Sequence, residues 1–293
     1  MNYLPDTILK QVYKKRNPWS HKGQFGRLLI IGGSKRYAGM TFTGLAAYRA
    51  GCDLVYLVGP QRAMDIAASY SPNLMTEPLE GDYLEPKHVK SIMEMVEEIK
   101  ATAVVIGPGL WRTQQTRKAI VELISRIQLP MVVDADAIRM ISAAKGKLYK
   151  KNAILTPHAN EFFELSSVKV SDNINERIKA VNDLAHEINC SGGVCPLVPP
   201  VNILLKGHVD VISNGVKTML NKTGSPYLTK GGTGDSLAGI CGALVARGID
   251  PFTAACAGAY INGKAGELAA KKYGEGLITT DLIEEIPSVI KYE

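Results

Sequence analysis

The stretch NKTGSPYLTKGGTGDSLAGICGALVARG, residues 221–248, contains the motif that decides the fold. Its centre, GGTGD at residues 231–235, leads directly into an apolar run that predicts a buried helix. A glycine loop that opens a helix leaves several backbone N–H groups unpaired, and the positive end of the helix dipole lies beside them. The stretch therefore predicts an anion site, for which phosphate is the usual ligand.

Asp235 is the acidic member of this loop, where a carboxylate would repel a bound phosphate. The arrangement makes chemical sense if Asp235 takes a proton from a hydroxyl group that attacks the phosphate. The alternative is that Asp235 only caps the helix and that the glycines only form a turn. The loop alone leaves both interpretations open, so the remaining sequence has to separate them.

The composition is that of a globular protein with a large core: of 293 residues, 46% are hydrophobic and 21% are charged. A net charge of +6 without a dense Lys/Arg run favours small anionic ligands and indicates no nucleic-acid partner. The N-terminus carries charges throughout and does not resemble a signal peptide. No apolar run reaches the roughly 18–20 residues that span a bilayer. These features predict a cytoplasmic protein with no membrane partner.

Two of the five cysteines, Cys190 and Cys195, flank a Ser-Gly-Gly-Val sequence in a loop rich in Gly and Pro. Their spacing would allow a disulfide, but a reducing compartment keeps most thiols free. We therefore expect two free thiols, and no Cys/His spacing in the sequence resembles a zinc site.

From residue 27 onward, apolar runs of strand length alternate with helical patterns. Strands are expected at 27–31, 54–58, 103–106, 131–133, 153–155 and 201–205, and a hairpin at 209–220. Helices are expected at 4–15, 39–51, 86–99, 113–127, 160–166, 173–189, 251–272 and 279–292, besides the one that follows GGTGD. This order predicts an α/β fold, with a mostly parallel central sheet and helices on both faces. A single domain is expected over residues 1–293, with residues 1–20 as a helical extension.

Glycines and polar residues directly follow the expected strands. They are Gly32-Gly33, Gly107-Pro108-Gly109, Asp134, Asp136, His158 and Lys206-Gly207. In a parallel sheet the carboxyl ends of the strands meet at one edge, where ligands bind. Alternatives remain for several of them: His158 could cap a helix, and Lys206 could be a solvated edge residue. Asp134 and Asp136 would point to opposite sides of a strand, so at most one is expected to face a ligand.

Several longer motifs occur in a fixed order. They are HKGQFGRLLIIGGS (21–34), VVDADAI (132–138), ILTPHANEF (154–162) and GGTGDSLAGI (231–240). In this order they resemble the ADP/ATP-dependent NAD(P)H-hydrate dehydratases, a family of ribokinase-like fold, over roughly residues 20–290. GGTGD is shared with other ribokinase-like kinases, whereas the other motifs are more specific.

The resemblance implies a role for each matching residue. Asp235 would be the catalytic carboxylate, with Gly232 and Gly234 forming the anion hole. Contacts with the dinucleotide hydrate are implied for Met40, Gly107, Gly109, His158 and Asp235. Contacts with the adenine nucleotide are implied for Lys206, Gly207, His208, Val209, Asp210, Thr233 and Gly234. Asp134 is a candidate for organising either a Mg²⁺ site or the substrate.

The implied reaction is the ADP- or ATP-dependent dehydration of the S-form of hydrated NADH or NADPH. It restores NAD(P)H and releases AMP or ADP with phosphate, and the phosphates imply Mg²⁺ as a cofactor. Two alternatives stay open: a ribokinase-like kinase for a vitamin-precursor alcohol, and a non-catalytic nucleotide-binding sensor. The intact Asp235 disfavours the sensor.

The sequence departs from the family pattern at Met40, where relatives often have alanine, and at Trp111, where they often have glycine. Larger side chains at these positions could reshape the substrate pocket. Many relatives also carry an N-terminal epimerase domain, whereas only about twenty residues precede HKGQFG. The resemblance therefore implies a stand-alone dehydratase that forms a homotetramer and works with a separate epimerase.

Overall fold

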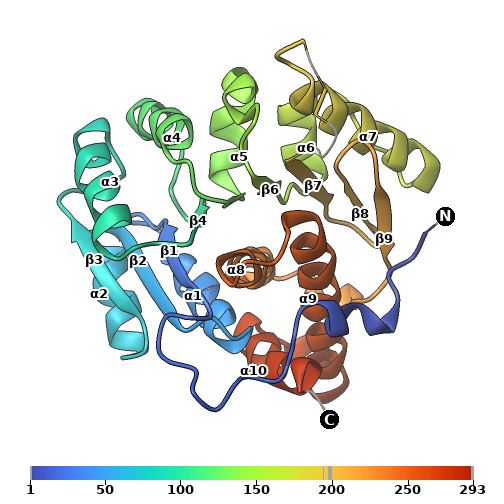
Figure 1. Cartoon of the computed structure of the whole chain (residues 1–293), viewed down its shortest axis with the longest axis horizontal. Coiled ribbons are helices and arrows are strands. Elements are labelled where there is room, and N and C mark those ends of the chain that lie inside the picture. The colour runs from blue at the N-terminus through green and yellow to red at the C-terminus, as the bar shows by residue number, and fades with distance from the viewer. Residues whose placement is uncertain (1, 194, 197–199, 292–293) are drawn as a thin grey trace.

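The computed structural model describes residues 2–193, 195–196 and 200–291. Within them, one sheet has the strand order β3-β2-β1-β4-β5-β6-β7-β8-β9 (Figure 1). Its strands are β1 (Arg27–Ile31), β2 (Leu54–Pro60), β3 (Met75–Leu79), β4 (Ala103–Ile106), β5 (Met131–Val133), β6 (Ala153–Leu155), β7 (Val201–Leu205), β8 (Asp210–Ser213) and β9 (Thr218–Asn221). The pairings from β3 to β7 are parallel, and β8 is antiparallel to both β7 and β9. The expected mostly parallel sheet is confirmed.

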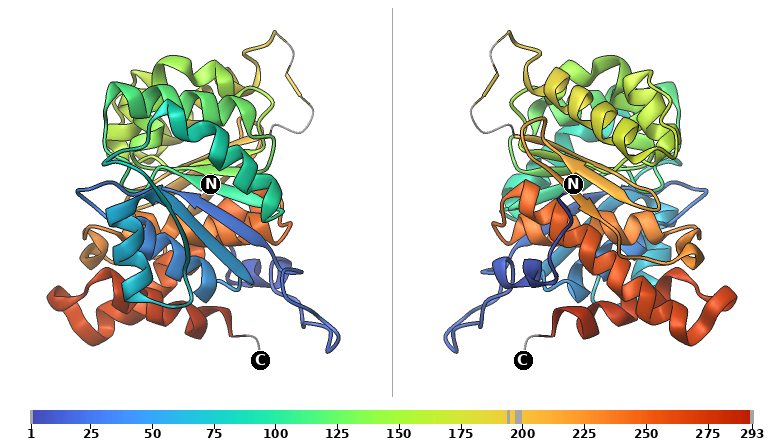
Figure 2. Two further views of the ribbon diagram at one scale, coloured as in Figure 1. Left: turned by 90° about the vertical axis from the view of Figure 1, so that its left-hand side faces the viewer. Right: turned by 90° about the vertical axis from the view of Figure 1, so that its right-hand side faces the viewer.

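Helices cover both faces of this sheet. They are α1 (Met40–Arg49), α2 (Gln61–Tyr70), α3 (Val89–Glu98), α4 (Gln114–Arg126), α5 (Asp136–Ile141), α6 (Ala159–Ser166), α7 (Ile174–Asn189), α8 (Thr233–Ala246), α9 (Pro251–Tyr273) and α10 (Thr279–Ile290). Short 3₁₀ helices are η1 (Asp6–Gln11), η2 (Pro86–His88), η3 (Ser142–Leu148), η4 (Pro226–Leu228) and η5 (Gly274–Gly276). The side views in Figure 2 show the sheet between the two helical layers.

Alternate strand residues point to opposite faces, so the sheet separates two cores. Leu28 and Ile30 belong to the core that packs against α1, α2, α8, α9 and α10. Leu29 and Ile31 belong to the core under the helices α3 to α7. All four of these side chains are fully buried, and complete burial of one such side chain contributes roughly 1.5–3 kcal/mol.

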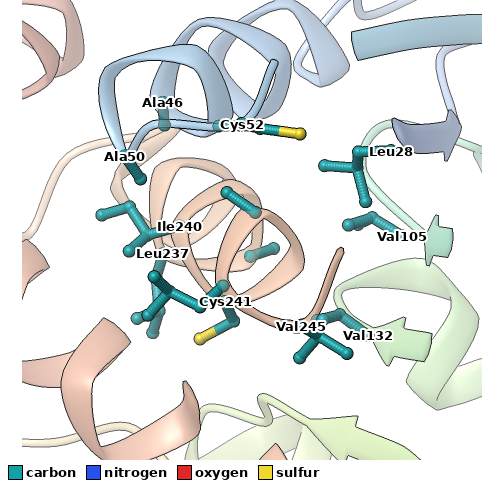
Figure 3. Close-up of a cluster of buried hydrophobic side chains, with 14 of the residues drawn as sticks. Leu28, Ala46, Ala50, Cys52, Val105, Val132, Leu237, Ile240, Cys241 and Val245 are labelled. Carbon is teal, nitrogen blue, oxygen red and sulfur yellow. The ribbon is translucent and has the colours of Figure 1, made fainter. Parts of the chain in front are cut away.

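Helix α8 lies in the middle of the core that contains Leu28 and Ile30. Every residue from Asp235 to Ala246 is buried, as expected for a helix that is apolar on all sides. Figure 3 shows Ile240, Cys241 and neighbouring α8 side chains between α1 and the sheet residues Leu28 and Val105. This packing fixes the direction of α8, and therefore the place where its GGTGD start meets the sheet edge.

Most expected elements are confirmed, but three corrections follow from local packing. The helix expected at 4–15 is only the 3₁₀ helix η1, which buries little more than Ile8. The sequence prediction missed α2 and β3; β3 is an edge strand with an exposed Pro78, so it lacks an apolar pattern. Asp136 begins helix α5 and does not continue a strand.

The expectation of free thiols at Cys190 and Cys195 is wrong in this structure, where the two form a disulfide. After α7 the chain turns back, which brings the two Cα atoms to 4.4 Å, within the distance that a disulfide spans. A reducing compartment says nothing about how close a turn brings two cysteines. In the described residues, none of the helices is long and apolar enough to cross a membrane.

Candidate active site

The GGTGD loop opens α8 at the carboxyl edge of the sheet. Gly232 is the N-cap of α8 with φ of 100°, a left-handed conformation that glycine adopts without strain. Two side chains hold the loop from outside: Thr279 Oγ1 donates a hydrogen bond to the Gly231 carbonyl, and Thr233 Oγ1 donates to the Leu228 carbonyl. The first N–H groups of α8 are thus presented in a fixed direction, as an anion hole requires.

Asp235 lies in the first turn of α8 and is only 8% exposed. Tyr37 Oη donates a hydrogen bond to Asp235 Oδ2 at 3.3 Å. A Cβ at Gly39 would lie 2.6 Å from the same oxygen, so glycine is needed there for the close approach. Burial, together with the charge of Asp134, raises the pKa of Asp235 to about 7. A carboxylate with such a pKa can exchange protons near neutral pH.

A network of charged side chains lies beside Asp235. Lys206 Nζ is 3.1 Å from Asp134 Oδ1 and 3.8 Å from Glu161 Oε2. Asp134 is 1% exposed, and Thr156 Oγ1 donates to its Oδ1 at 2.6 Å. Burial alone would lower the pKa of Lys206, but Asp134 and Glu161 outweigh it and raise the pKa. Lys206 is therefore a fixed cation next to the anion hole.

This network contains more negative than positive charge. Asp134, Glu161 and Asp235 face Lys206, and Arg139 approaches Glu161 only to 3.9 Å while also pairing with Glu164. Burial raises the pKa of Glu161. A surplus of buried carboxylates beside the start of α8 suits a hard divalent cation, which prefers oxygen ligands.

His158 follows β6 and caps helix α6. Its Nδ1 accepts hydrogen bonds from the backbone N–H groups of Asn160 and Glu161, and Glu161 in turn accepts from the His158 N–H. Burial, with the charge of Lys206, lowers the pKa of His158. The ring also lines the pocket beside Lys206. His158 therefore has the capping role that the sequence left open and still faces the site.

A pocket of about 670 Å³ extends from the GGTGD loop along η4 and α9. Its volume is in the range of sites for small ligands. It is lined by His158, Lys206, Gly207, His208, Asp210, Lys222, Thr223, Gly224, Ser225, Pro226, Leu228, Thr229, Lys230, Thr233, Gly234, Leu237, Ala259, Asn262 and Gly263. Of the residues predicted to contact a nucleotide, Lys206, Gly207, His208, Asp210, Thr233 and Gly234 line it. Val209 lies on the same loop but is not among the lining residues.

Two hydrogen bonds hold the carboxylate of Asp210, which lines this pocket. Gly207 N donates to its Oδ1 and Asn221 Nδ2 donates to its Oδ2, both at 2.9 Å. Burial raises the pKa of Asp210 to about 6. Asn221, which the sequence places at the start of the GGTGD stretch, thus links β9 to the loop between β7 and β8.

The loops that follow β1 and β4 lie beside Asp235, which Tyr37 of the first loop contacts. The chain runs from β1 through β2 to β3 at one edge and then crosses back to β4 on the other side of β1, so the boundary between β1 and β4 is the topological switch point where α/β sheets bind ligands. Gly107 and Gly109 follow β4 there, and Gly33 N donates to the Pro108 carbonyl at 2.8 Å. Met40 is 0% exposed and packs in the core, so its contact with the substrate stays a prediction.

The structure adds residues that the sequence did not reveal. Tyr37 reaches Asp235, and no spacing or motif pointed to it. Glu161 belongs to the quoted TPHANEF motif, and its position three residues after His158 is a capping-box spacing that could have identified it. Asp134 enters the charged network, whereas Asp136, which begins α5 and does not lie on a strand as expected, accepts a hydrogen bond from Trp111 N at its Oδ2.

Comparison with known proteins places this site in context. A family model described as NAD(P)H-hydrate dehydratase matches residues 28–288. The bifunctional NAD(P)H-hydrate repair enzyme Nnr of Pyrobaculum aerophilum is 40% identical over 275 residues, which are 93% of this chain and 52% of that protein. The chain thus spans about half the length of such bifunctional relatives.

Other relatives match over their whole length. The ADP-dependent (S)-NAD(P)H-hydrate dehydratase of Cenarchaeum symbiosum is 34% identical, over 98% of this chain and 95% of that protein. The Bacillus subtilis ADP/ATP-dependent NAD(P)H-hydrate dehydratase, crystallised with ATP and Mg²⁺, is 25% identical with a TM-score of 0.76, covering 98% of this chain and 97% of that one. On the family model and these relatives together, the chain belongs to the NAD(P)H-hydrate dehydratase family.

Proposed function

We propose that the chain catalyses the ADP- or ATP-dependent dehydration of the S-form of hydrated NADH or NADPH. The observation that carries this proposal is Asp235, a buried carboxylate with a pKa of about 7 at the start of α8. It lies between a pocket of about 670 Å³ and the loops at the β1/β4 switch point. One side suits a nucleotide that donates a phosphoryl group, and the other suits the dinucleotide that accepts it.

In the proposed reaction, Asp235 takes the proton of the ring hydroxyl group. The oxygen of that hydroxyl group attacks the terminal phosphorus of ADP at the same time. The bond from that phosphorus to the bridging oxygen breaks, and AMP leaves with the electron pair. The phosphorylated hydroxyl is then a good leaving group, which the lone pair of the ring nitrogen expels as phosphate to give an iminium ion. Loss of a proton from the adjacent ring carbon to solvent then restores the ring double bond. The backbone N–H groups of Gly232 and Gly234 would stabilise the charge on the transferred phosphoryl oxygens.

Nucleotide binding is assigned to the pocket beside Lys206. The Lys206 ammonium, 3.2 Å from a Cβ built at Gly234, would contact a phosphate at the start of α8. Gly207, His208 and Asp210 would hold the nucleoside, with Val209 supporting the loop from behind. Thr233 would add its backbone N–H to the phosphate site.

A Mg²⁺ ion fits the surplus of buried carboxylates described above, and Asp134 and Glu161 are the residues that would hold it, directly or through water. When bound, it would neutralise phosphate charge. The chain itself keeps Lys206 and these carboxylates in place, so that the phosphate meets a balanced set of charges.

The direct test is incubation of the purified chain with hydrated NADH and ADP. Return of NADH absorbance together with equimolar AMP and phosphate supports the proposal. Stable phosphorylation of another alcohol without return of NADH would instead favour the small-molecule kinase. Nucleotide binding without turnover of any kind would favour the sensor. Since only the S-form is consumed, the R-form requires a separate epimerising activity.

Tyr37→Phe tests the hydrogen bond to Asp235. This bond lowers the pKa of the carboxyl group, so its loss should raise that pKa further and move the acidic limb of the kcat/KM profile to higher pH. Activity at neutral pH should fall by about 3–10-fold, as for loss of one modest hydrogen bond. The phenyl ring retains the packing over Gly109, so thermal stability is the control. An acidic limb that stays in place would show that Tyr37 does not act through Asp235.

A further inference from the structure

Trp111 adopts an unusual conformation in the loop after β4. Its φ is 62°, a region that bulky residues rarely occupy. Trp111 N donates a hydrogen bond to Asp136 Oδ2 at 3.0 Å, which holds the backbone in this state. The residue is nevertheless 44% exposed, so burial of the indole does not account for the strain. Such strain is typical of sites where a side chain has to be presented in one direction.

Arg36 lies over the ring of Trp111, with its guanidinium carbon 4.5 Å from the ring centroid. The neighbouring cations are already paired, Lys35 with Asp82 and Arg112 with Asp136. Among the described residues, none places a carboxylate within 4.0 Å of Arg36. Arg36 is thus a positioned cation whose charge remains available to a ligand.

This pair lies on the loops that follow β1 and β4, at the switch point of the sheet. Arg36 precedes Tyr37, whose hydroxyl reaches Asp235, and Trp111 lies two residues after Gly109. A Cβ at Gly109 would lie 3.1 Å from the Tyr37 carbonyl oxygen, so the loops after β1 and β4 touch. A dinucleotide with its hydrated ring at Asp235 would extend outward along these loops.

We propose that Arg36 and Trp111 form the subsite for the adenosine 2′-phosphate end of the dinucleotide, so that the enzyme prefers hydrated NADPH to hydrated NADH. A guanidinium binds a phosphate with two parallel hydrogen bonds, and the indole offers its open face to adenine. The indole also keeps the guanidinium in one orientation. This inference rests on the proposed function, because it names the substrate of that same site.

The kinetic test compares Arg36→Gln with the matched control Lys35→Gln, which removes a charge one residue away that Asp82 already pairs. With saturating ADP, Arg36→Gln should lower kcat/KM for hydrated NADPH by about 10–100-fold, the effect of losing charged hydrogen bonds. The kcat/KM for hydrated NADH should change less than about 3-fold, because this substrate has no 2′-phosphate for Arg36 to bind. Lys35→Gln should change neither. Equal losses for both hydrates, or no loss, would overturn the proposal.

A binding test does not depend on turnover. The chain has two tryptophans, so in a Trp19→Phe background Trp111 is the fluorescent reporter. With ADP saturating the other pocket, adenosine 2′,5′-bisphosphate should change its fluorescence and bind about 10–100-fold more tightly than AMP. Arg36→Gln should abolish this difference. If the bisphosphate binds no better than AMP, the subsite is absent even if the enzyme dehydrates hydrated NADPH; if it binds as expected in an inactive protein, only the proposed function fails.

Trp111→Gly separates ligand contact from folding. Glycine accepts the positive φ, so thermal stability should not decrease. The affinity for adenosine 2′,5′-bisphosphate, followed calorimetrically with ADP present, should still fall several-fold because Arg36 loses its support. Unchanged affinity in this variant would remove Trp111 from the subsite.

Discussion

Asp235→Asn is expected to abolish turnover, lowering kcat by about 10²–10⁴-fold, the contribution of a positioned base. The asparagine has the same shape and can still accept the hydrogen bond from Tyr37, but it cannot take a proton. The anion hole and Lys206 remain, so the affinity for ADP should be retained or slightly increased as the repulsive charge disappears. Single-turnover kinetics with hydrated NADH and equilibrium binding of ADP measure the two effects separately.

The stability of this variant provides the control. Burial raises the pKa of Asp235 from 3.8 to about 7, so between these values the folded protein binds more protons than the unfolded chain. The free energy of unfolding of the wild type should therefore decrease as pH rises from about 4 to 7, by up to about 4 kcal/mol from this group. Asp235→Asn removes this dependence and should be the more stable protein at pH 8. Retained turnover would eliminate the carboxylate mechanism, whereas a collapsed fold at pH 8 would contradict the buried-charge explanation.

Activity should rise with pH, whereas the free energy of unfolding falls with pH. Asp235 acts as a base only when ionised, so kcat/KM should rise with pH through about 7 and then level. A profile that is flat between pH 5 and 9 would indicate a different base. If the acidic limb of the kcat/KM profile moves to higher pH in Tyr37→Phe, that limb reports the ionisation of Asp235.

Lys206→Met is the second change with a large expected effect. The Lys206 side chain is 21% exposed, but its partner Asp134 is 1% exposed, so the substitution leaves buried carboxylates without their nearest cation. Loss of one partner of such a pair typically costs about 3–5 kcal/mol of stability. Turnover should fall by about 10²–10³-fold because the phosphate site loses its fixed positive charge. Chemical denaturation and the NADH-recovery assay measure the two losses.

The double variant Lys206→Met with Asp134→Asn tests whether charge imbalance is the cause. Asparagine keeps the volume of Asp134 and can still accept from Thr156, but it carries no charge. Much of the lost stability should return while activity stays low. If the double variant is no more stable than the single one, the two residues do not act as a pair, and the loss comes from packing of the lysine stem instead.

The sequence predicted the framework well because the framework depends on local patterns. The apolar runs of β1, β4, β5 and β7 are short and continuous, as strands buried on both faces are, and α8 is apolar throughout. The edge strand β3 was missed because Met75–Leu79 contains exposed polar residues and a proline. The disulfide of Cys190 was missed because a turn sets the distance to Cys195, and composition does not describe turns.

By itself the sequence determined an α/β sheet whose glycine loops and polar strand ends collect at one edge, with Asp235 in a glycine loop that opens a helix. Only the tertiary structure decided how those groups behave. Burial of α8 sets the protonation of Asp235, and the approach of Tyr37 and Lys206 from other elements sets its neighbours. The physical reason is that periodicity is encoded between adjacent residues, whereas desolvation and charge pairing arise between residues far apart in the chain, such as Arg36 and Trp111.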